Sequence, residues 1–136
     1  MPGPRIYTVE EANGLVPVLE EAFLRLDALR VRLKTLKIKL TALEMIWGSS
    51  VHETRCPDHA EAIDLVAQLK KVEEEFNAVL AGLGERSVAI KDVETGLLDL
   101  YHVREGVLVH LCWKRGEPSF QAWHHVDAGF AGRQPL

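Results

Sequence analysis

The chain has 136 residues, 47% of them hydrophobic, and a formal net charge of −4 at pH 7. This length and composition predict a single domain over residues 1–136 with enough apolar side chains for a sizeable core. The net negative charge gives no sign of a basic surface for nucleic acid. The chain contains no run of about 18 apolar residues, so no membrane span is predicted. The N-terminus carries no apolar signal segment, so we expect a cytoplasmic protein in which Cys56 and Cys112 stay reduced.

The first predicted helix covers residues 8–47 and begins at a capping box. The Thr8 hydroxyl can accept the backbone N–H of Glu11, and the Glu11 carboxylate can accept the backbone N–H of Thr8. Pro17 lacks an N–H, and its ring clashes with a carbonyl one turn earlier. A kink or break is therefore expected near Gly14–Val16.

Beyond this kink the apolar residues follow a 3-4 heptad pattern, which is typical of a helix packed along another helix. Two interleaved series make up the pattern: Leu19, Leu26, Leu33, Leu40 and Trp47, and Ala22, Leu29, Leu36 and Leu43. A second helix is predicted over residues 58–83 from a further series: Leu65, Leu69, Val72, Phe76, Val79 and Leu83. Joined by a modest loop, the two helices predict a long antiparallel hairpin.

The hairpin suggests self-association. Two helices alone leave much of their apolar surface in water, so the hairpins of two copies are expected to associate as a homodimer. The simpler interpretation of both stripes is packing within one chain.

After Gly84 the periodicity changes, and residues 86–136 are predicted to form a small antiparallel β-unit with an ordered, docked C-terminal tail. Two β-type runs, Leu97–Val103 and Val107–Trp113, flank a turn signal, and Val88–Ile90 is expected to be a third short strand. The fold class is therefore predicted to be α+β.

The register of this β-hairpin decides which polar side chains share a face. One loop length places Asp99 opposite Cys112 and Tyr101 opposite His110, which makes a polar surface. A loop that is one residue longer places Asp99 opposite Leu111, and the polar side chains then no longer share a face. The sequence does not choose between the two registers. Cys112 is interpreted as a small buried hydrophobe rather than a nucleophile, because nothing in the sequence orders a histidine and an aspartate around it.

Candidate metal ligands gather in the C-terminal region. One helical turn is expected near Phe120–His124, and His124 and Asp127, three residues apart, would face one side of such a turn. Further ligands could come from three other residues: Asp99, Glu117 and His110. Imidazole with carboxylates suits a divalent transition metal such as zinc. The structural alternative is a histidine that donates to a carboxylate.

The same region contains candidate ligand-binding residues. Arg133 follows two glycines that permit tight turns, so its guanidinium could hold an anionic small molecule. The favoured interpretation is that it pairs with a carboxylate of the chain: Asp99, Glu117 or Asp127. Trp113 and Trp123 could wall a ligand pocket or fill a core, and core packing is the favoured interpretation.

The loop between the helices also contains residues of the types that bind zinc: His52, Glu53, Cys56, Asp58 and His59. Their spacing matches no standard zinc motif, so a polar loop tip is expected.

Five short stretches carry a resemblance to a known family: Thr8-Val-Glu-Glu-Ala-Asn13, Leu15-Val-Pro17, Gly96-Leu-Leu-Asp99, Leu111-Cys-Trp-Lys-Arg-Gly-Glu117 and Trp123-His-His-Val-Asp127-Ala-Gly129-Phe-Ala-Gly-Arg133. They resemble a family of small bacterial proteins catalogued as domain of unknown function 2203. The chain departs from that family after Asp99, where Leu100-Tyr101 replaces the common Phe-Pro. The resemblance implies no established reaction.

Two functional hypotheses of different classes follow. The leading one is an uncharacterised cytoplasmic protein that self-associates through its helices as a binding or structural module. The alternative is a metal- or anion-binding protein, or a metal-dependent enzyme, with its site between the β-hairpin and the C-terminal tail.

Overall fold

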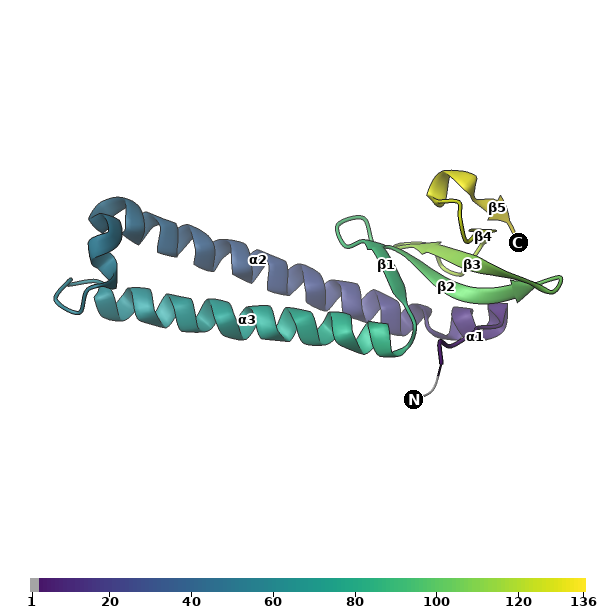
Figure 1. Cartoon of the computed structure of the whole chain (residues 1–136), viewed down its shortest axis with the longest axis horizontal. Coiled ribbons are helices and arrows are strands. Elements are labelled where there is room, and N and C mark those ends of the chain that lie inside the picture. Colours follow the sequence, from purple (N-terminus) through teal and green to yellow (C-terminus); the bar gives the residue numbers. More distant parts are fainter. Residues whose placement is uncertain (1–2) are drawn as a thin grey trace. The chain divides into compact units, whose positions relative to one another are not determined.

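The computed structural model describes residues 3–136 and confirms the α+β class (Figure 1). The helical elements are α1 (Val9–Gly14), α2 (Val16–Trp47), the 3-10 turn η1 (Gly48–His52), α3 (His59–Glu85) and the 3-10 turn η2 (Phe130–Gly132). The strands are β1 (Ala89–Asp92), β2 (Leu97–Arg104), β3 (Val107–Lys114), β4 (Ala122–His125) and β5 (Gln134–Pro135). No helix of the described residues is long and apolar enough to cross a membrane.

The chain divides into two compact units. The hairpin unit is Arg25–Val79, and the sheet unit comprises the residues up to Leu24 together with Leu80–Leu136. The single domain expected over residues 1–136 stays a prediction.

The helical region begins at the capping box and has the interruption near Pro17 that the sequence predicts. The Thr8 backbone nitrogen lies 2.9 Å from Glu11 Oε1, and the Glu11 nitrogen lies 3.1 Å from Thr8 Oγ1, so the capping box is present. The helix is interrupted at Leu15, between α1 and α2. Pro17 follows the first residue of α2, where a missing N–H needs no helical partner. The predicted break is therefore confirmed.

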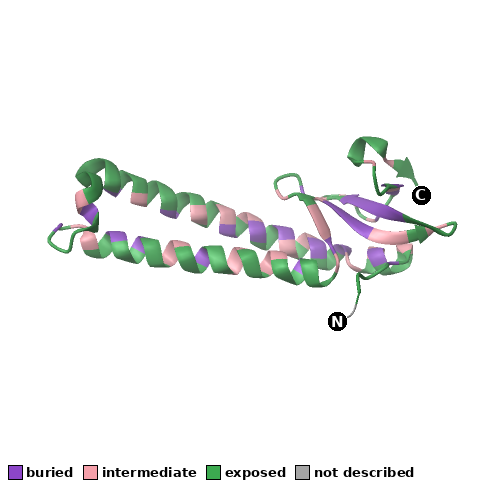
Figure 2. Cartoon of the chain, viewed as in Figure 1, coloured by how far each residue is buried: buried purple, intermediate pink, exposed green. Residues whose placement is uncertain are grey.

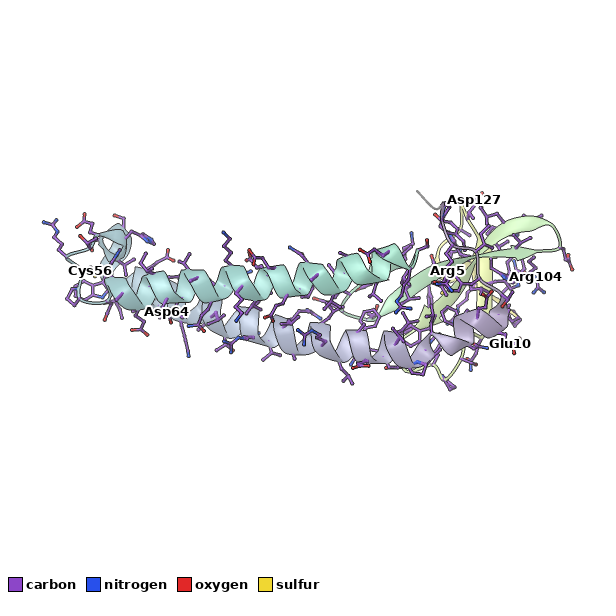
Figure 3. The ribbon with its side chains drawn as sticks, turned by 90° about the horizontal axis from the view of Figure 1, so that it is seen from below. Arg5, Glu10, Cys56, Asp64, Arg104 and Asp127 are labelled. Carbon is purple, nitrogen blue, oxygen red and sulfur yellow. The ribbon has the colours of Figure 1, made fainter. Side chains whose placement is uncertain are left out.

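In the hairpin unit the two helices pack through the predicted heptad stripe (Figure 2). The buried residues of this core are Leu29, Leu36, Leu43, Val51, Cys56, Ala62, Leu65 and Val72. Leu33, Leu40, Leu69, Phe76 and Val79 pack against it while partly exposed. Figure 3 shows Cys56 and Asp64 near the loop end of the hairpin. The heptad stripe is thus used within one chain, and α3 continues two residues beyond the predicted end at Leu83.

The sheet unit is a five-stranded antiparallel sheet in the order β1-β2-β3-β4-β5. Glu105 and Gly106 have positive φ values of 52° and 78° at the β2–β3 turn, as both central residues of a tight two-residue hairpin turn can require. This two-residue turn sets the register that pairs Asp99 with Cys112 and Tyr101 with His110. Of the two open registers, the structure therefore has the one that makes a polar face.

The helical turn predicted near Phe120–His124 is wrong, because Ala122–His125 form strand β4. Cα partners His110 and His124 lie opposite each other, and Cys112 lies opposite Ala122. Burial alternates along β4, as in a strand, with Ala122 and His124 buried and His125 exposed. Backbone hydrogen bonds to β3 override a local pattern too short to hold a helix.

The two faces of the sheet differ in chemistry. One face carries Leu98, Leu100, Leu111 and Trp113, all buried, and the Trp113 ring lies 6.1 Å from that of Phe23 in α2. The opposite face carries polar side chains from β2, β3 and β4. A docked tail is expected to bury Phe130, but the structure leaves this side chain 40% exposed.

Candidate metal centre

The polar face of the sheet brings together side chains from three strands. Asp99 on β2, His110 and Cys112 on β3, and His124 on β4 point to the same side, because paired residues of neighbouring strands share a face. Asp99, Cys112 and His124 are almost completely buried, with exposed fractions of 3%, 1% and 2%. A buried carboxylate costs free energy unless it is paired, so this grouping needs a physical explanation.

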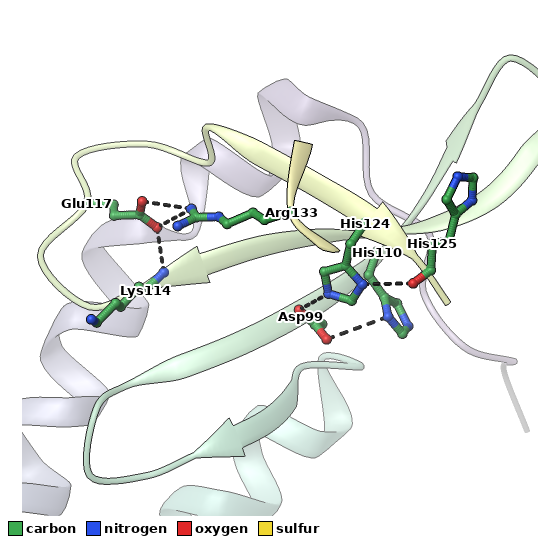
Figure 4. Close-up of polar contacts among 7 residues, drawn as sticks. All are labelled: Asp99, His110, Lys114, Glu117, His124, His125 and Arg133. Atoms are coloured by element: carbon green, nitrogen blue, oxygen red, sulfur yellow. Dashed lines mark hydrogen bonds and ion pairs between the residues drawn. The ribbon is translucent and has the colours of Figure 1, made fainter. Parts of the chain in front are cut away.

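His124 contacts an acceptor at each ring nitrogen (Figure 4). Its Nε2 lies 3.0 Å from Asp99 Oδ1, and its Nδ1 lies 2.8 Å from the backbone carbonyl oxygen of His125. A carbonyl oxygen accepts only, and so does an ionised carboxylate. A neutral imidazole carries one N–H, so it satisfies one contact and turns a lone pair toward the other oxygen.

Three arrangements resolve this conflict. His124 can be an imidazolium that donates to both oxygens, or Asp99 can carry a proton, or a cation can lie between Nε2 and the carboxylate. In the third arrangement Nδ1–H donates to the His125 carbonyl and Nε2 offers its lone pair. A histidine that ligates a metal is usually oriented in this way, with its second nitrogen donating to a backbone carbonyl or a carboxylate.

Cys112 adds a third ligand type to the pair. Potential ligand atoms of Asp99, Cys112 and His124 all lie within 4.8 Å of one another. In a tetrahedral zinc site, ligand atoms are roughly 3.3–3.8 Å apart, so small side-chain rotations would bring these three into coordination distance. Burial and the neighbouring Asp99 charge raise the pKa of the Cys112 thiol to about 12. Without a cation the thiol therefore stays protonated and is no nucleophile at neutral pH.

His110 stands beside this group with an unsatisfied nitrogen. Its Nδ1 is buried and makes no hydrogen bond within the described residues, although it lies 3.5 Å from Asp99 Oδ2. The His110 ring meets the His124 ring edge-on, with centroids 5.1 Å apart. Burial lowers the pKa of His110, opposed by Asp99 and assisted by His124 and Lys91. His110 is thus a second imidazole that reaches the carboxylate without completing a bond to it.

A cavity of about 250 Å³ opens in front of these side chains. Asp99, His110, Cys112 and His124 line it from the sheet, and the tail covers it with Val126, Ala128, Gly129 and Phe130. Lys91 of β1 and Leu97 of β2 complete the lining. A small ligand bound in the cavity would be next to the three clustered groups.

Glu117 and Arg133, both predicted site residues, form a separate pair (Figure 4). Arg133 Nη2 lies 2.7 Å from both Glu117 carboxylate oxygens, and Glu117 Oε1 also accepts the backbone N–H of Lys114 at 2.7 Å. Arg133 thus has the partner that the sequence offered as its alternative to an anionic ligand. Glu117 is engaged by this pair and is outside the group of clustered ligand atoms.

Asp127 and the two tryptophans are also outside the cluster. Asp127 is exposed in the turn after β4, because strand geometry replaces the helical turn that would have placed it beside His124. Trp113 is fully buried on the opposite face of the sheet, and its Nε1–H donates to the Glu117 carbonyl at 2.9 Å. Trp123 is half-buried, with the Arg104 guanidinium 4.9 Å from its ring centroid. None of the three lines the cavity.

The loop between α2 and α3 contributes no group of clustered ligands. Within residues 3–136, the only set of three or more potential ligands that converge is Asp99, Cys112 and His124. His59 Nδ1 instead lies 3.0 Å from the Val51 carbonyl oxygen, and Asp58 accepts the Trp47 indole N–H at 2.7 Å. These contacts are structural, as expected for a polar loop tip.

Cys112 is the one residue of the cluster that was not predicted as a ligand from the sequence. The register that places Asp99 opposite Cys112 would have indicated it. The cluster also requires His124 to lie on a strand next to β3. A segment of four residues gives no local sequence signal for such a strand.

The fold and the site define an α+β protein in which a helical hairpin is joined to an antiparallel sheet carrying a buried aspartate–cysteine–histidine cluster. The chain belongs to the family described as uncharacterised conserved protein, domain of unknown function 2203, whose family model matches residues 5–136. No curated protein and no solved structure matches the chain.

Proposed function

We propose that this protein binds a divalent transition metal ion, with zinc the best fit, through Asp99, Cys112 and His124. The observation that carries the proposal is the buried His124 ring, held between two acceptor oxygens with a thiol beside it. One carboxylate, one thiolate and one imidazole are ligands that zinc takes in proteins. A bound dication would remove the lone-pair conflict at Nε2 and compensate the buried Asp99 charge.

The surroundings of the three ligands also support this proposal. The His125 carbonyl is placed to fix the His124 tautomer, and His110 Nδ1 is placed to donate to the second Asp99 oxygen or to a bound ligand. A dication would stabilise the thiolate of Cys112, and binding would release the thiol proton.

A zinc ion held by these three protein ligands would keep a fourth coordination position, and the cavity that the same residues line could supply its occupant. Catalytic zinc sites keep such a position for water or substrate, whereas structural sites fill all four with protein ligands. The arrangement therefore favours a reactive or ligand-exchanging metal centre over a purely structural one. Lys91 at the cavity would favour an anionic ligand. Self-association through the hairpin unit is a second candidate function, favoured by the exposed apolar residues Val31, Ile38 and Met45 of α2.

Metal content of protein purified without a metal-affinity tag tests the proposal. We expect close to one zinc or related ion per chain by elemental analysis, and loss of that ion in His124→Ala and Asp99→Asn variants. Cobalt substitution adds a direct signature, because a thiolate ligand gives a ligand-to-metal charge-transfer band that Cys112→Ser should remove.

Each ligand has a matched control of the same residue type. His125→Ala, Asp127→Asn and Cys56→Ser change the neighbouring histidine, a nearby carboxylate and the other cysteine, and each should keep the metal. Absence of metal after reconstitution of the folded wild-type protein with zinc or cobalt would contradict the proposal. That result would leave a buried imidazolium–carboxylate pair, or a protonated Asp99, as the explanation of the geometry.

A further inference from the structure

The outer surface of α2 carries a second apolar stripe that the hairpin core leaves uncovered. Val31, Ile38 and Met45 are 67%, 60% and 82% exposed, although they lie on the same helix as the buried leucines. Each is seven positions from the next, and exposed Ala28, Thr35 and Ala42 lie three positions before Val31, Ile38 and Met45 respectively. A groove along α2 includes Val31, Ile38, Ala42 and Met45 in its lining.

This spacing fits another helix better than a flat or irregular partner. A 3-4 repeat aligns side chains along one side of a helix, where they can insert between residues of a facing helix. From Ala28 to Met45 the stripe is about 27 Å long, given the rise per residue of a helix. Singly scattered hydrophobic residues on a surface need no explanation, whereas a continuous row indicates an interaction surface.

Charge indicates which helix would cover the stripe. Residues 25–47 of α2 contain six basic and two acidic residues, whereas residues 59–79 of α3 contain five acidic and two basic residues. A second α2 would place basic flanks against each other, which costs free energy. The acidic α3 of a second copy is complementary, and it presents Ile63 and Val66 at 51% and 45% exposure.

Several of these charges are available for a partner. Within the described part of the chain, Lys34 and Lys37 on α2 and Glu73 and Glu74 on α3 form no ion pair, and all four are exposed. Arg25 and Glu75, by contrast, already face each other within the chain at 3.9 Å.

We infer that two copies of this chain associate through their hairpin units, with the Val31–Ile38–Met45 stripe of α2 packed against α3 of the second copy. A two-fold axis then produces the same contact twice, because each chain supplies one α2 and one α3. The inference does not depend on the metal centre, whose ligands are in the sheet unit.

A first experiment measures the oligomeric state by sedimentation and light scattering over a range of concentrations. We expect a dimer for the wild type, and a dissociation constant raised about a hundredfold or more in the double variant Val31→Glu, Ile38→Glu. Both residues are exposed, so circular dichroism should show an unchanged helix content. Val107→Glu replaces a 53%-exposed valine of the sheet unit and should leave the dimer intact.

A second experiment tests the identity of the partner helix. The pair Lys34→Glu, Lys37→Glu and the pair Glu73→Lys, Glu74→Lys should each weaken the homodimer, because each places like charges across both contacts. Mixing the two variants should restore association as a heterodimer, since both of its contacts then join opposite charges. Failure of the mixture to associate would overturn α3 as the partner, and a monomeric wild type would overturn the dimer and assign the stripe to a different protein.

Discussion

At the scale of single residues, the buried histidine His124 is the most informative group in the sheet unit. Its two ring nitrogens both face acceptor oxygens, and its neighbours Asp99 and Cys112 are equally buried. A residue pair of this kind is an ion pair, a pair in which Asp99 carries a proton, or a pair of metal ligands. In each case, removing one partner leaves the other without its hydrogen bond or charge compensation in a region of low dielectric constant.

We expect Asp99→Asn to lower the free energy of unfolding of the metal-free protein by about 3–5 kcal/mol, the usual cost of breaking a buried charged pair. Urea denaturation in the presence of a chelator measures this. Asp127→Asn is the matched control and should change stability by less than about 0.5 kcal/mol, because Asp127 is exposed. Equal effects of the two substitutions would show that Asp99 has no special partner.

The Arg133–Glu117 pair allows a second residue-scale prediction. Arg133→Lys keeps the charge but loses the planar guanidinium, which lies 4.8 Å from the Phe130 ring centroid while its Nη2 contacts both Glu117 oxygens, so we expect a loss of about 1 kcal/mol in unfolding free energy. Arg55→Lys is the control, because the Arg55–Glu53 pair is highly exposed and contributes little. A double-mutant cycle with Glu117→Gln should give a coupling energy of about 1 kcal/mol, and a coupling near zero would show that the pair does not hold the tail.

At the scale of elements, the helices depend on local sequence signals, whereas the strands depend on pairing with their neighbours. The helices follow local signals, which include the Thr8–Glu11 capping box and the heptad leucines. The sheet depends on turns that hold neighbouring strands in one register. Gly96, between β1 and β2, has a φ of +72°, and a Cβ built on it would lie 2.4 Å from the Arg115 Cβ. This position therefore requires glycine for both its backbone conformation and its space.

Substitutions at two glycines should have opposite effects on stability. We expect Gly96→Ala to destabilise the protein by about 1–2 kcal/mol or more, because it combines a left-handed backbone with a steric clash. Gly82→Ala lies in the exposed part of α3 with no atom near the added Cβ, and should stabilise by about 0.5–1 kcal/mol. Thermal unfolding of both variants measures the contrast. A stabilised Gly96→Ala protein would contradict the structure of this turn.

At the scale of the whole molecule, the two proposed activities belong to different compact units. The candidate ligands are in the sheet unit and the outer α2 stripe is in the hairpin unit. Substitutions that share no contacting residues usually have additive effects. The metal centre and the dimer contact should therefore be separable by mutation.

We expect the Val31→Glu, Ile38→Glu variant to bind metal as the wild type does, and His124→Ala to associate as the wild type does. Metal content and sedimentation, measured on the same preparations, give both results. Loss of metal in the hairpin variant, with its fold intact, would instead show that the two units are coupled.

The sequence by itself determined the elements whose signals are local. Heptad spacing, the capping box and Pro17 were sufficient for α1, α2 and α3, because a helix makes its hydrogen bonds within a few residues. The same reasoning identified Asp99 and His124 as candidates but failed for β4, because a strand of four residues exists only through its ladder to β3.

Only the tertiary structure decided which of these residues meet. Asp99, Cys112 and His124 come from three strands, and the register of each pair, set by turns and by burial of the opposite face, brings them to one side. Tertiary structure likewise decided that Leu36 packs within the hairpin, whereas Val31 stays exposed. Periodicity shows that a side chain lies on an apolar stripe, but what covers that stripe depends on contacts between segments distant in the chain.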